Sequence, residues 1–137
     1  MYLVGFPLLI IPLVLYNIIA FLFGQGFGDT LFTVQMMSGA TLGVTTGDLI
    51  IVLSILLLFV EILKATRFGT KSIVDHMLSF VVFVVALGEF LMAPKAATST
   101  FLLFLVICAI DVVGGFSISI RAASRDYSVD GSHPVVR

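Results

Sequence analysis

Four long apolar runs alternate with short polar segments along this chain, at residues 2–23, 48–66, 72–92 and 98–122. Each run has about the 20 residues that a helix needs to cross the ~30 Å apolar core of a bilayer. A longer segment, 24–47, follows the first run, and a polar tail occupies 123–137. We therefore predict an all-α membrane protein, in which a single domain forms a bundle of four transmembrane helices.

Capping signals agree with these limits. Thr45 with Asp48, and Ser72 with Asp75, have the spacing of a capping box at the starts of the second and third helices. Pro12 lies inside the first run. An interior proline removes one helical hydrogen bond, so we predict a bend there that neighbouring helices offset.

The segment 24–47 contains a second pattern. Apolar residues alternate with other residues on both sides of Ser38-Gly39, at positions Phe32, Val34, Met36, Leu42 and Val44. Alternation with period two around a glycine-containing turn is typical of a β-hairpin. We predict a hairpin whose apolar face rests on the outer helix ends or on a partner; the alternative is an irregular interfacial loop.

Composition supports a membrane location. Of the 137 residues, 60% are apolar and 11% are charged, whereas a soluble domain has roughly 25% charged residues. This excludes a soluble globular enzyme as a first hypothesis, and the apolar content excludes a disordered chain. No basic cluster is present to neutralise phosphates, so we expect no nucleic-acid partner. The expected partners are the lipid bilayer and other membrane-protein subunits or further copies of the chain.

The basic residues predict an orientation. They flank the second turn (Lys64, Arg67, Lys71) and follow the fourth run (Arg121, Arg125, Arg137), with Lys95 alone on the other side. The positive-inside rule then places both termini in the cytoplasm and segment 24–47 in the periplasm of a bacterial inner membrane. No basic residue precedes Lys64, so the first run is interpreted as a retained helix rather than a signal peptide.

Ionisable residues within the runs are the main candidates for function, because they are costly in lipid. Asp111 lies about nine residues, or roughly 14 Å, from the inner end of its helix. His76 and Glu61 are expected in the same leaflet, and Lys64 can pair with Glu61 on one helix face. A cluster of Asp111, His76 and Glu61 could relay protons or bind a cation. The favoured alternative is an aspartate that fixes helix packing by a polar bond.

Small residues in the fourth run predict a packing face. Gly114 and Gly115 permit close backbone approach, and Gly115 with Ser119 forms a small-xxx-small pair. Near the other end of the bundle, Asn17 and Glu89 are placed where they could share a hydrogen bond, and Lys95 could reach toward Glu89.

Motifs of catalysis are missing from the sequence, which has no phosphate-binding glycine loop, no HExxH and no GxSxG. The single cysteine, Cys108, offers no thiolate pair. We therefore expect no metal site, no cofactor and no enzymatic activity. The leading hypothesis is a non-catalytic accessory or scaffold subunit of a larger membrane complex, or a homo-oligomer. The alternative is a small proton- or cation-coupled transport element that uses Asp111 with His76 and Glu61; an intramembrane enzyme acting on lipid or quinone ranks last.

Overall fold

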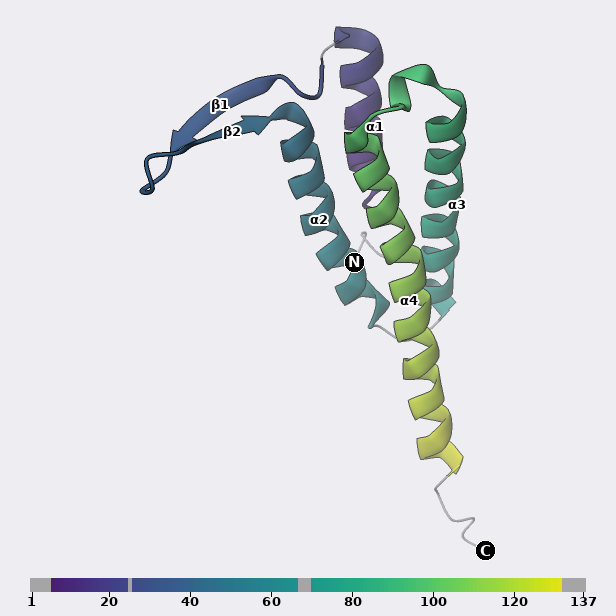
Figure 1. Ribbon diagram of the computed structural model, residues 1–137. Coiled ribbons are helices and arrows are strands. Elements are labelled where there is room, and N and C mark those ends of the chain that lie inside the picture. The colour runs from purple at the N-terminus through teal and green to yellow at the C-terminus, as the bar shows by residue number, and fades with distance from the viewer. Residues whose placement is uncertain (1–5, 25, 67–69, 132–137) are drawn as a thin grey trace, which may run out of the picture.

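The computed structural model describes residues 6–24, 26–66 and 70–131 as a bundle of helices with a β-hairpin at one end (Figure 1). In chain order the elements are α1 (Ile10–Asn17), the π-helix η1 (Ile18–Phe23), β1 (Thr30–Gln35), β2 (Thr41–Thr45), α2 (Thr46–Ala65), α3 (Thr70–Met92), the 3₁₀-helix η2 (Pro94–Ala96) and α4 (Ser99–Gly131). We call the end that carries the hairpin the hairpin end, and the end where α2 is followed by α3 the opposite end.

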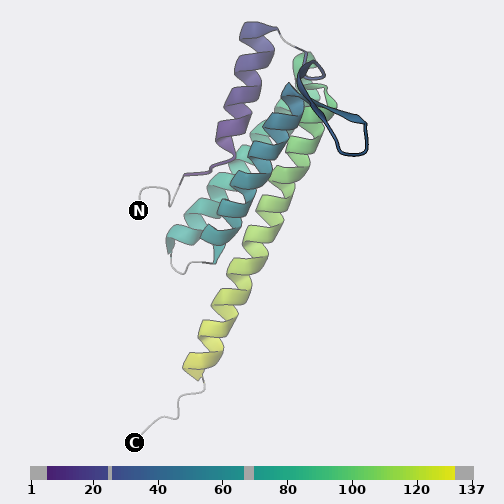
Figure 2. The ribbon, with the colours of Figure 1, turned by 90° about the vertical axis from the view of Figure 1, so that its left-hand side faces the viewer.

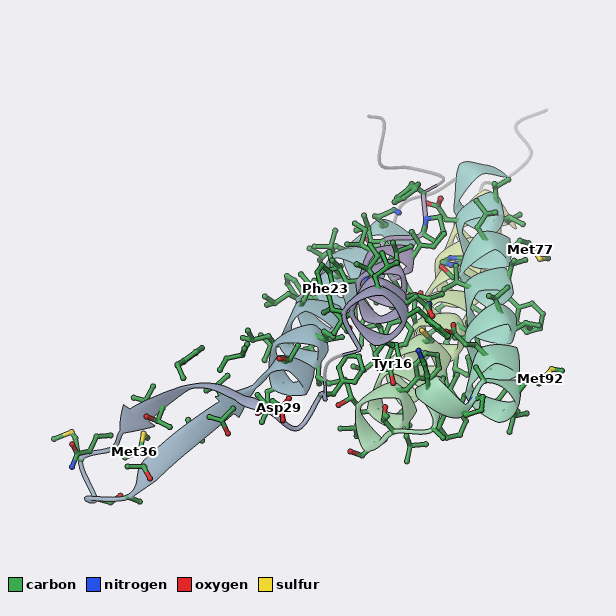
Figure 3. The ribbon with its side chains drawn as sticks, turned by 90° about the horizontal axis from the view of Figure 1, so that it is seen from above. Tyr16, Phe23, Asp29, Met36, Met77 and Met92 are labelled. Atoms are coloured by element: carbon green, nitrogen blue, oxygen red, sulfur yellow. The ribbon has the colours of Figure 1, made fainter. Side chains whose placement is uncertain are left out.

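Three helices are long and apolar enough to cross a membrane, over Thr46–Ala65, Ile73–Met92 and Ser99–Ile118. Helix α4 packs against both α2 and α3, which have few contacts with each other. Seen from above, α1 lies between α2 and α3, on the side away from α4 (Figure 3). The bundle predicted from the apolar runs is confirmed for these three helices.

The predicted start of the first helix, at residue 2 of the run 2–23, is wrong. Helix α1 begins at Ile10, and residues 2–5 lie outside the described part. The 8 residues of α1 and the 6 of η1 rise about 21 Å, which is short of the ~30 Å apolar core. Pro12 is the third residue of α1, and a first-turn residue has no intrahelical acceptor for its N–H. The expected interior bend at Pro12 is therefore also wrong.

The hairpin is confirmed, and its two strands pair antiparallel with Phe32 opposite Val44 and Val34 opposite Leu42. Gly39 closes the turn with a φ of 90°, a conformation that favours glycine. The strands extend sideways from the start of α2 (Figures 1 and 2), and every residue of β1 is exposed. The expectation that the apolar face rests on the helix ends is wrong, because the hairpin leaves the bundle instead of folding back over it.

The core at the hairpin end is built around Tyr16, which is 1% exposed. Its ring stacks on Phe27 at 4.1 Å between centroids. Its hydroxyl donates to the Lys95 carbonyl oxygen at 2.8 Å and shares a second hydrogen bond, 2.7 Å long, with the Thr98 hydroxyl. Tyr16 thus joins α1 to the segment that leads into β1 and to the turn between α3 and α4 (Figure 3).

The helix limits follow local signals in part. The capping box at α2 is confirmed: the Thr45 hydroxyl accepts from the Asp48 N–H at 3.1 Å, and the Asp48 carboxylate accepts from the Thr45 N–H at 2.9 Å. The second predicted capping box is wrong, because α3 starts at Thr70 and Ser72 lies inside it.

Helix α4 continues past the end of its apolar run at residue 122 to Gly131. The loss of apolar residues marks where a helix can leave lipid, but it does not end the backbone hydrogen bonding. The first part of the predicted tail 123–137 is therefore helical, which Figure 2 shows as a long projection beyond the other helices.

Candidate functional site

Six polar side chains from three helices are buried toward the opposite end of the bundle. They are Glu61 and Lys64 of α2, Asp75, His76 and Ser79 of α3, and Asp111 of α4, with exposed fractions of 4–8%. We call this group the buried polar cluster. Buried ionisable groups are expensive in an apolar setting unless they are paired or hydrogen-bonded, so each contact in it bears on stability as well as on function.

Glu61 and Lys64 bind the backbone that precedes α1. The Glu61 Oε1 atom accepts from the Leu8 N–H at 2.8 Å and from the Lys64 ammonium at 3.1 Å. The Lys64 ammonium also donates to the Phe6 carbonyl oxygen at 2.7 Å. The Glu61–Lys64 pair predicted from the i, i+3 spacing is confirmed. Its contact with the N-terminal segment was missed by the sequence analysis.

Pro7 is the signal that could have revealed that contact. It lies between Phe6 and Leu8, whose peptide groups are outside any helix. A backbone polar group buried without a partner costs about as much as a lost hydrogen bond. A non-helical start in an apolar segment therefore requires polar side chains from elsewhere, and α2 provides them.

Asp75 extends the ionic contacts to α3. Its Oδ2 atom lies 4.0 Å from the Lys64 ammonium, while its Oδ1 atom is buried and has no hydrogen-bond partner among the described residues. The side chain of Lys71, which the spacing had offered as a partner for Asp75, lies outside the described part. Three carboxyl groups, on Glu61, Asp75 and Asp111, therefore share the surroundings of one lysine.

Asp111 hydrogen-bonds to Ser79 across the interface between α3 and α4. Its carboxylate is also within electrostatic range of Glu61 and Lys64, and the His76 ring is within range of Asp75, Glu61 and Lys64. The structure thus brings Asp111, His76 and Glu61 to the same region. The hydrogen-bond partner shown for Asp111 is Ser79, whereas Glu61 is engaged by Leu8 and Lys64.

His76 lies against a glycine on α4. A Cβ atom placed on Gly115 would come within 2.8 Å of the His76 Nδ1 atom, and the His76 ring centroid lies 5.4 Å from that of Phe116. Gly114 differs, because a Cβ atom there would meet no atom of the described chain within 4 Å. The side chain of Ser119, the third predicted packing residue, lies outside the described part.

At the hairpin end, the amide of Asn17 donates to the Glu89 Oε2 atom at 3.2 Å, so the hydrogen bond that the sequence left open as a possibility is present. The same amide group donates to the Leu13 carbonyl oxygen at 2.9 Å. The Lys95 ammonium lies 5.1 Å from the centroid of the Phe21 ring rather than pairing with Glu89. These contacts fix α1 against α3 and the turn that follows it.

The chemistry open to the buried polar cluster is proton binding and internal hydrogen bonding. Across residues 6–24, 26–66 and 70–131, no group of three or more His, Cys, Asp or Glu side chains is arranged to hold a metal ion. A shallow apolar hollow, open to the surroundings, lies along an exposed face of α4. It is lined by Val106, Ala109, Ile110, Val113 and Gly114.

No family model, curated protein or solved structure matches the chain.

Proposed function

We propose that the chain is a non-catalytic accessory or scaffold subunit that crosses the membrane and packs against other transmembrane helices, as part of a larger complex or of a homo-oligomer. The observation that carries this proposal is that the buried charged side chains bind other segments of the same chain. Glu61 and Lys64 hold the backbone of residues 6–8, and Asp111 bonds to Ser79 on the neighbouring helix. These groups hold segments of one chain together by hydrogen bonds and an ion pair, which is a structural role of polar groups in membrane bundles.

The path of residues 6–23 supports a fourth crossing. It runs from the Glu61–Lys64 pair, in the last two turns of α2, to the hairpin end. Although α1 and η1 are short, the non-helical residues before them extend the path, and the Phe6 carbonyl and the Leu8 N–H are bound by Lys64 and Glu61, as lipid requires of polar backbone groups. We infer four crossings with both termini on the cytoplasmic side of a bacterial inner membrane, as the distribution of Lys and Arg favours.

The hollow on α4 is the surface that we propose for contact with a partner helix. Its lining is apolar, and Gly114 leaves space for close approach. Helices in lipid associate through packing at small residues rather than through a hydrophobic driving force. A ridge of a second helix, from another copy or another subunit, would fill this space.

Native mass spectrometry of the protein after mild extraction tests the proposal. We expect a particle heavier than one chain of 14.8 kDa, and we expect Gly114→Phe, which fills the hollow, to reduce it to the single chain. Leu102→Phe is the matched control, because Leu102 is 47% exposed on the same helix and does not line the hollow. A single chain in the unsubstituted protein, or equal effects of the two variants, contradicts the proposal.

A proton- or cation-coupled transport element is the second candidate. The specific observation in its favour is the buried Oδ1 atom of Asp75, which lacks a hydrogen-bond partner among the described residues, in a cluster where Glu61, Asp75 and Asp111 all lie in the surroundings of Lys64. Intramembrane carboxyl groups of this kind occur in proton relays. Such a chain would use Asp111, His76 and Glu61 with Asp75.

Asp111→Asn in proteoliposomes separates the two candidates. The amide keeps the shape and a hydrogen bond to Ser79 but cannot ionise. If a proton or cation flux disappears while the mass of the particle is unchanged, the transport element is supported. If no flux occurs in either protein and the particle stays assembled, the scaffold is supported.

A further inference from the structure

The hairpin has one apolar face and no charge. Phe32 pairs with Val44 and Val34 with Leu42, and paired residues lie on the same side of a sheet. The paired positions between them carry Thr33, Gln35, Thr41 and Gly43, and Leu31, which is 54% exposed, lies at the irregularity between Thr30 and Phe32. No charged residue occurs between Asp29 and Asp48. The four apolar side chains, which we call the hairpin face, therefore form a surface without ionic groups on an element that projects from the bundle.

This surface is uncovered in the single chain. Phe32, Val34 and Leu42 are 49%, 44% and 50% exposed. A two-stranded hairpin alone is at best marginally stable in water. Contiguous exposed apolar surface of this kind marks an interaction site with a protein or a membrane.

The position of the hairpin favours lipid as the occupant. It leaves the start of α2 sideways, and its turn lies beside the first turns of α2 rather than beyond the end of the bundle (Figures 1 and 2). Asp29 lies at its base and Met36 at its far end (Figure 3). The outer surface of α2 at the same level is also apolar and exposed, with Leu49 at 44% and Val52 at 53%. The hairpin thus lies beside a part of α2 whose outer surface is apolar as well.

Hydrogen bonding fixes how deep the hairpin can lie. The sheet has two strands, so each strand has an outer edge of unpaired N–H and C=O groups. Such edges cannot enter the hydrocarbon core, where no water satisfies them. At the boundary between head groups and acyl chains, the edges and the Thr and Gln side chains stay hydrated while the hairpin face meets lipid.

We propose that the hairpin is an interfacial membrane anchor, with the side chains of Phe32, Val34, Leu42 and Val44 against the lipid of the leaflet at the hairpin end. The inference rests on the proposed membrane crossing. Because the contact is apolar and residues 30–47 carry no charge, it does not require anionic lipid. It also sets the depth of the start of α2 in the bilayer, since β2 ends at Thr45 and α2 begins at Thr46.

Single tryptophans test the anchor, because the chain has no tryptophan of its own. Phe32→Trp and Val34→Trp report on the hairpin face, and Thr33→Trp is the matched control on the other face. Leu56→Trp reports on the outer surface of α2, where Leu56 is 60% exposed. Each full-length variant is reconstituted in phosphatidylcholine vesicles brominated near the top of the acyl chains, and Leu56→Trp, which lies mid-helix, in vesicles brominated near the chain ends. Quenching by the lipid is compared with quenching by aqueous acrylamide.

We expect lipid bromines to quench Phe32→Trp and Val34→Trp several-fold more strongly than Thr33→Trp, with the reverse order for acrylamide. Addition of phosphatidylglycerol should leave this order unchanged. Equal, strong quenching of both faces by acrylamide overturns the anchor and places the hairpin in water. Protection of Phe32→Trp from both quenchers overturns it in favour of a second copy. Absence of lipid quenching at Leu56→Trp instead refutes the membrane crossing itself.

Discussion

At the scale of single residues, the buried polar cluster explains how an apolar chain can tolerate several ionisable groups. Glu61 and Lys64 are 5% and 8% exposed, and each binds a backbone group of residues 6–8 as well as the other. A buried ion pair adds little net stability, but removing one partner leaves a charge that nothing compensates. The pair therefore makes the position of the N-terminal segment specific.

Lys64→Met tests this role. It leaves the Glu61 and Asp75 carboxylates without their cation and the Phe6 carbonyl without its donor, which should cost about 3–5 kcal/mol. Adding Glu61→Gln removes one uncompensated charge and keeps an oxygen that accepts from Leu8. The double variant should therefore be more stable than Lys64→Met alone in unfolding by SDS from mixed micelles. A loss that is simply the sum of the two single losses contradicts the interpretation.

Gly115→Ala probes the contact between α3 and α4. The added methyl group would meet the His76 ring at 2.8–2.9 Å, and overpacking of this kind costs about 1–3 kcal/mol. Gly88→Ala is the control, because a Cβ there meets no atom of the described chain within 4 Å and alanine favours a helix by about 1 kcal/mol. The same SDS titration should show the two variants shifted in opposite directions, and equal shifts would mean that His76 moves away freely.

The sequence predicted contacts between single residues best where the two partners are close in the chain, or where both lie at a similar distance from the same end of the bundle. The Glu61–Lys64 pair and the Thr45–Asp48 capping box lie within a turn of each other on the chain. The contact of Glu61 with Leu8 joins positions 53 residues apart, and no pattern in one sequence reports such a pairing.

At the scale of elements, capping residues predict where a helix begins, whereas hydropathy predicts only which part of the chain prefers an apolar environment. The start of α2 follows its capping box, whereas α1 starts at Ile10 although residues 6–9 before it are also apolar, and α4 continues into polar sequence. Hydropathy overestimated the first helix and underestimated the last for the same reason. Hydropathy reports whether the side chains prefer lipid or water, and it does not report the backbone conformation. A non-helical backbone can also lie in an apolar setting if its polar groups are hydrogen-bonded.

Thr45→Ala should loosen the junction between the hairpin and α2. It removes the acceptor of the Asp48 N–H, and loss of such a cap costs about 1 kcal/mol. Thr41→Ala, in the same strand but outside the capping box, should change the free energy of unfolding by less than about 0.5 kcal/mol. Hydrogen exchange should also speed up at the N–H groups of the first turn of α2 in Thr45→Ala alone; unchanged exchange there would show that tertiary packing, not the cap, holds this turn.

At the scale of the whole molecule, different kinds of contact stabilise the two ends of the bundle. The hairpin end relies on the Tyr16 ring and its two hydrogen bonds, with Asn17 bound to Glu89. The opposite end relies on the buried polar cluster. The first set of contacts holds α1 and the second holds Phe6 and Leu8 just before it, so the direction of the chain that enters α1 is fixed by Lys64 and Glu61.

That direction yields a prediction of topology. Phe6 and Leu8 are bound by residues in the last two turns of α2, so the N-terminus should leave the membrane on the side of Thr66 and not on the side of the hairpin. In a Cys108→Ala background, which removes the single cysteine, a cysteine added before Met1 should react with a membrane-impermeant maleimide from the same side as Thr66→Cys. Ser38→Cys, in the hairpin turn, should react from the other side.

A cysteine before Met1 that reacts together with Ser38→Cys would mean that residues 6–23 enter and leave on one side. The chain would then cross three times, and Leu8 could not remain bonded to Glu61. The same labelling in Glu61→Leu, which removes the acceptor of the Leu8 N–H, shows whether the polar contact or hydrophobicity determines the path of the N-terminal segment. If the polar contact fixes the path of the N-terminal segment, this variant should become labelled from both sides, whereas if hydrophobicity alone inserts the segment, its labelling should match that of the cysteine variant without the substitution.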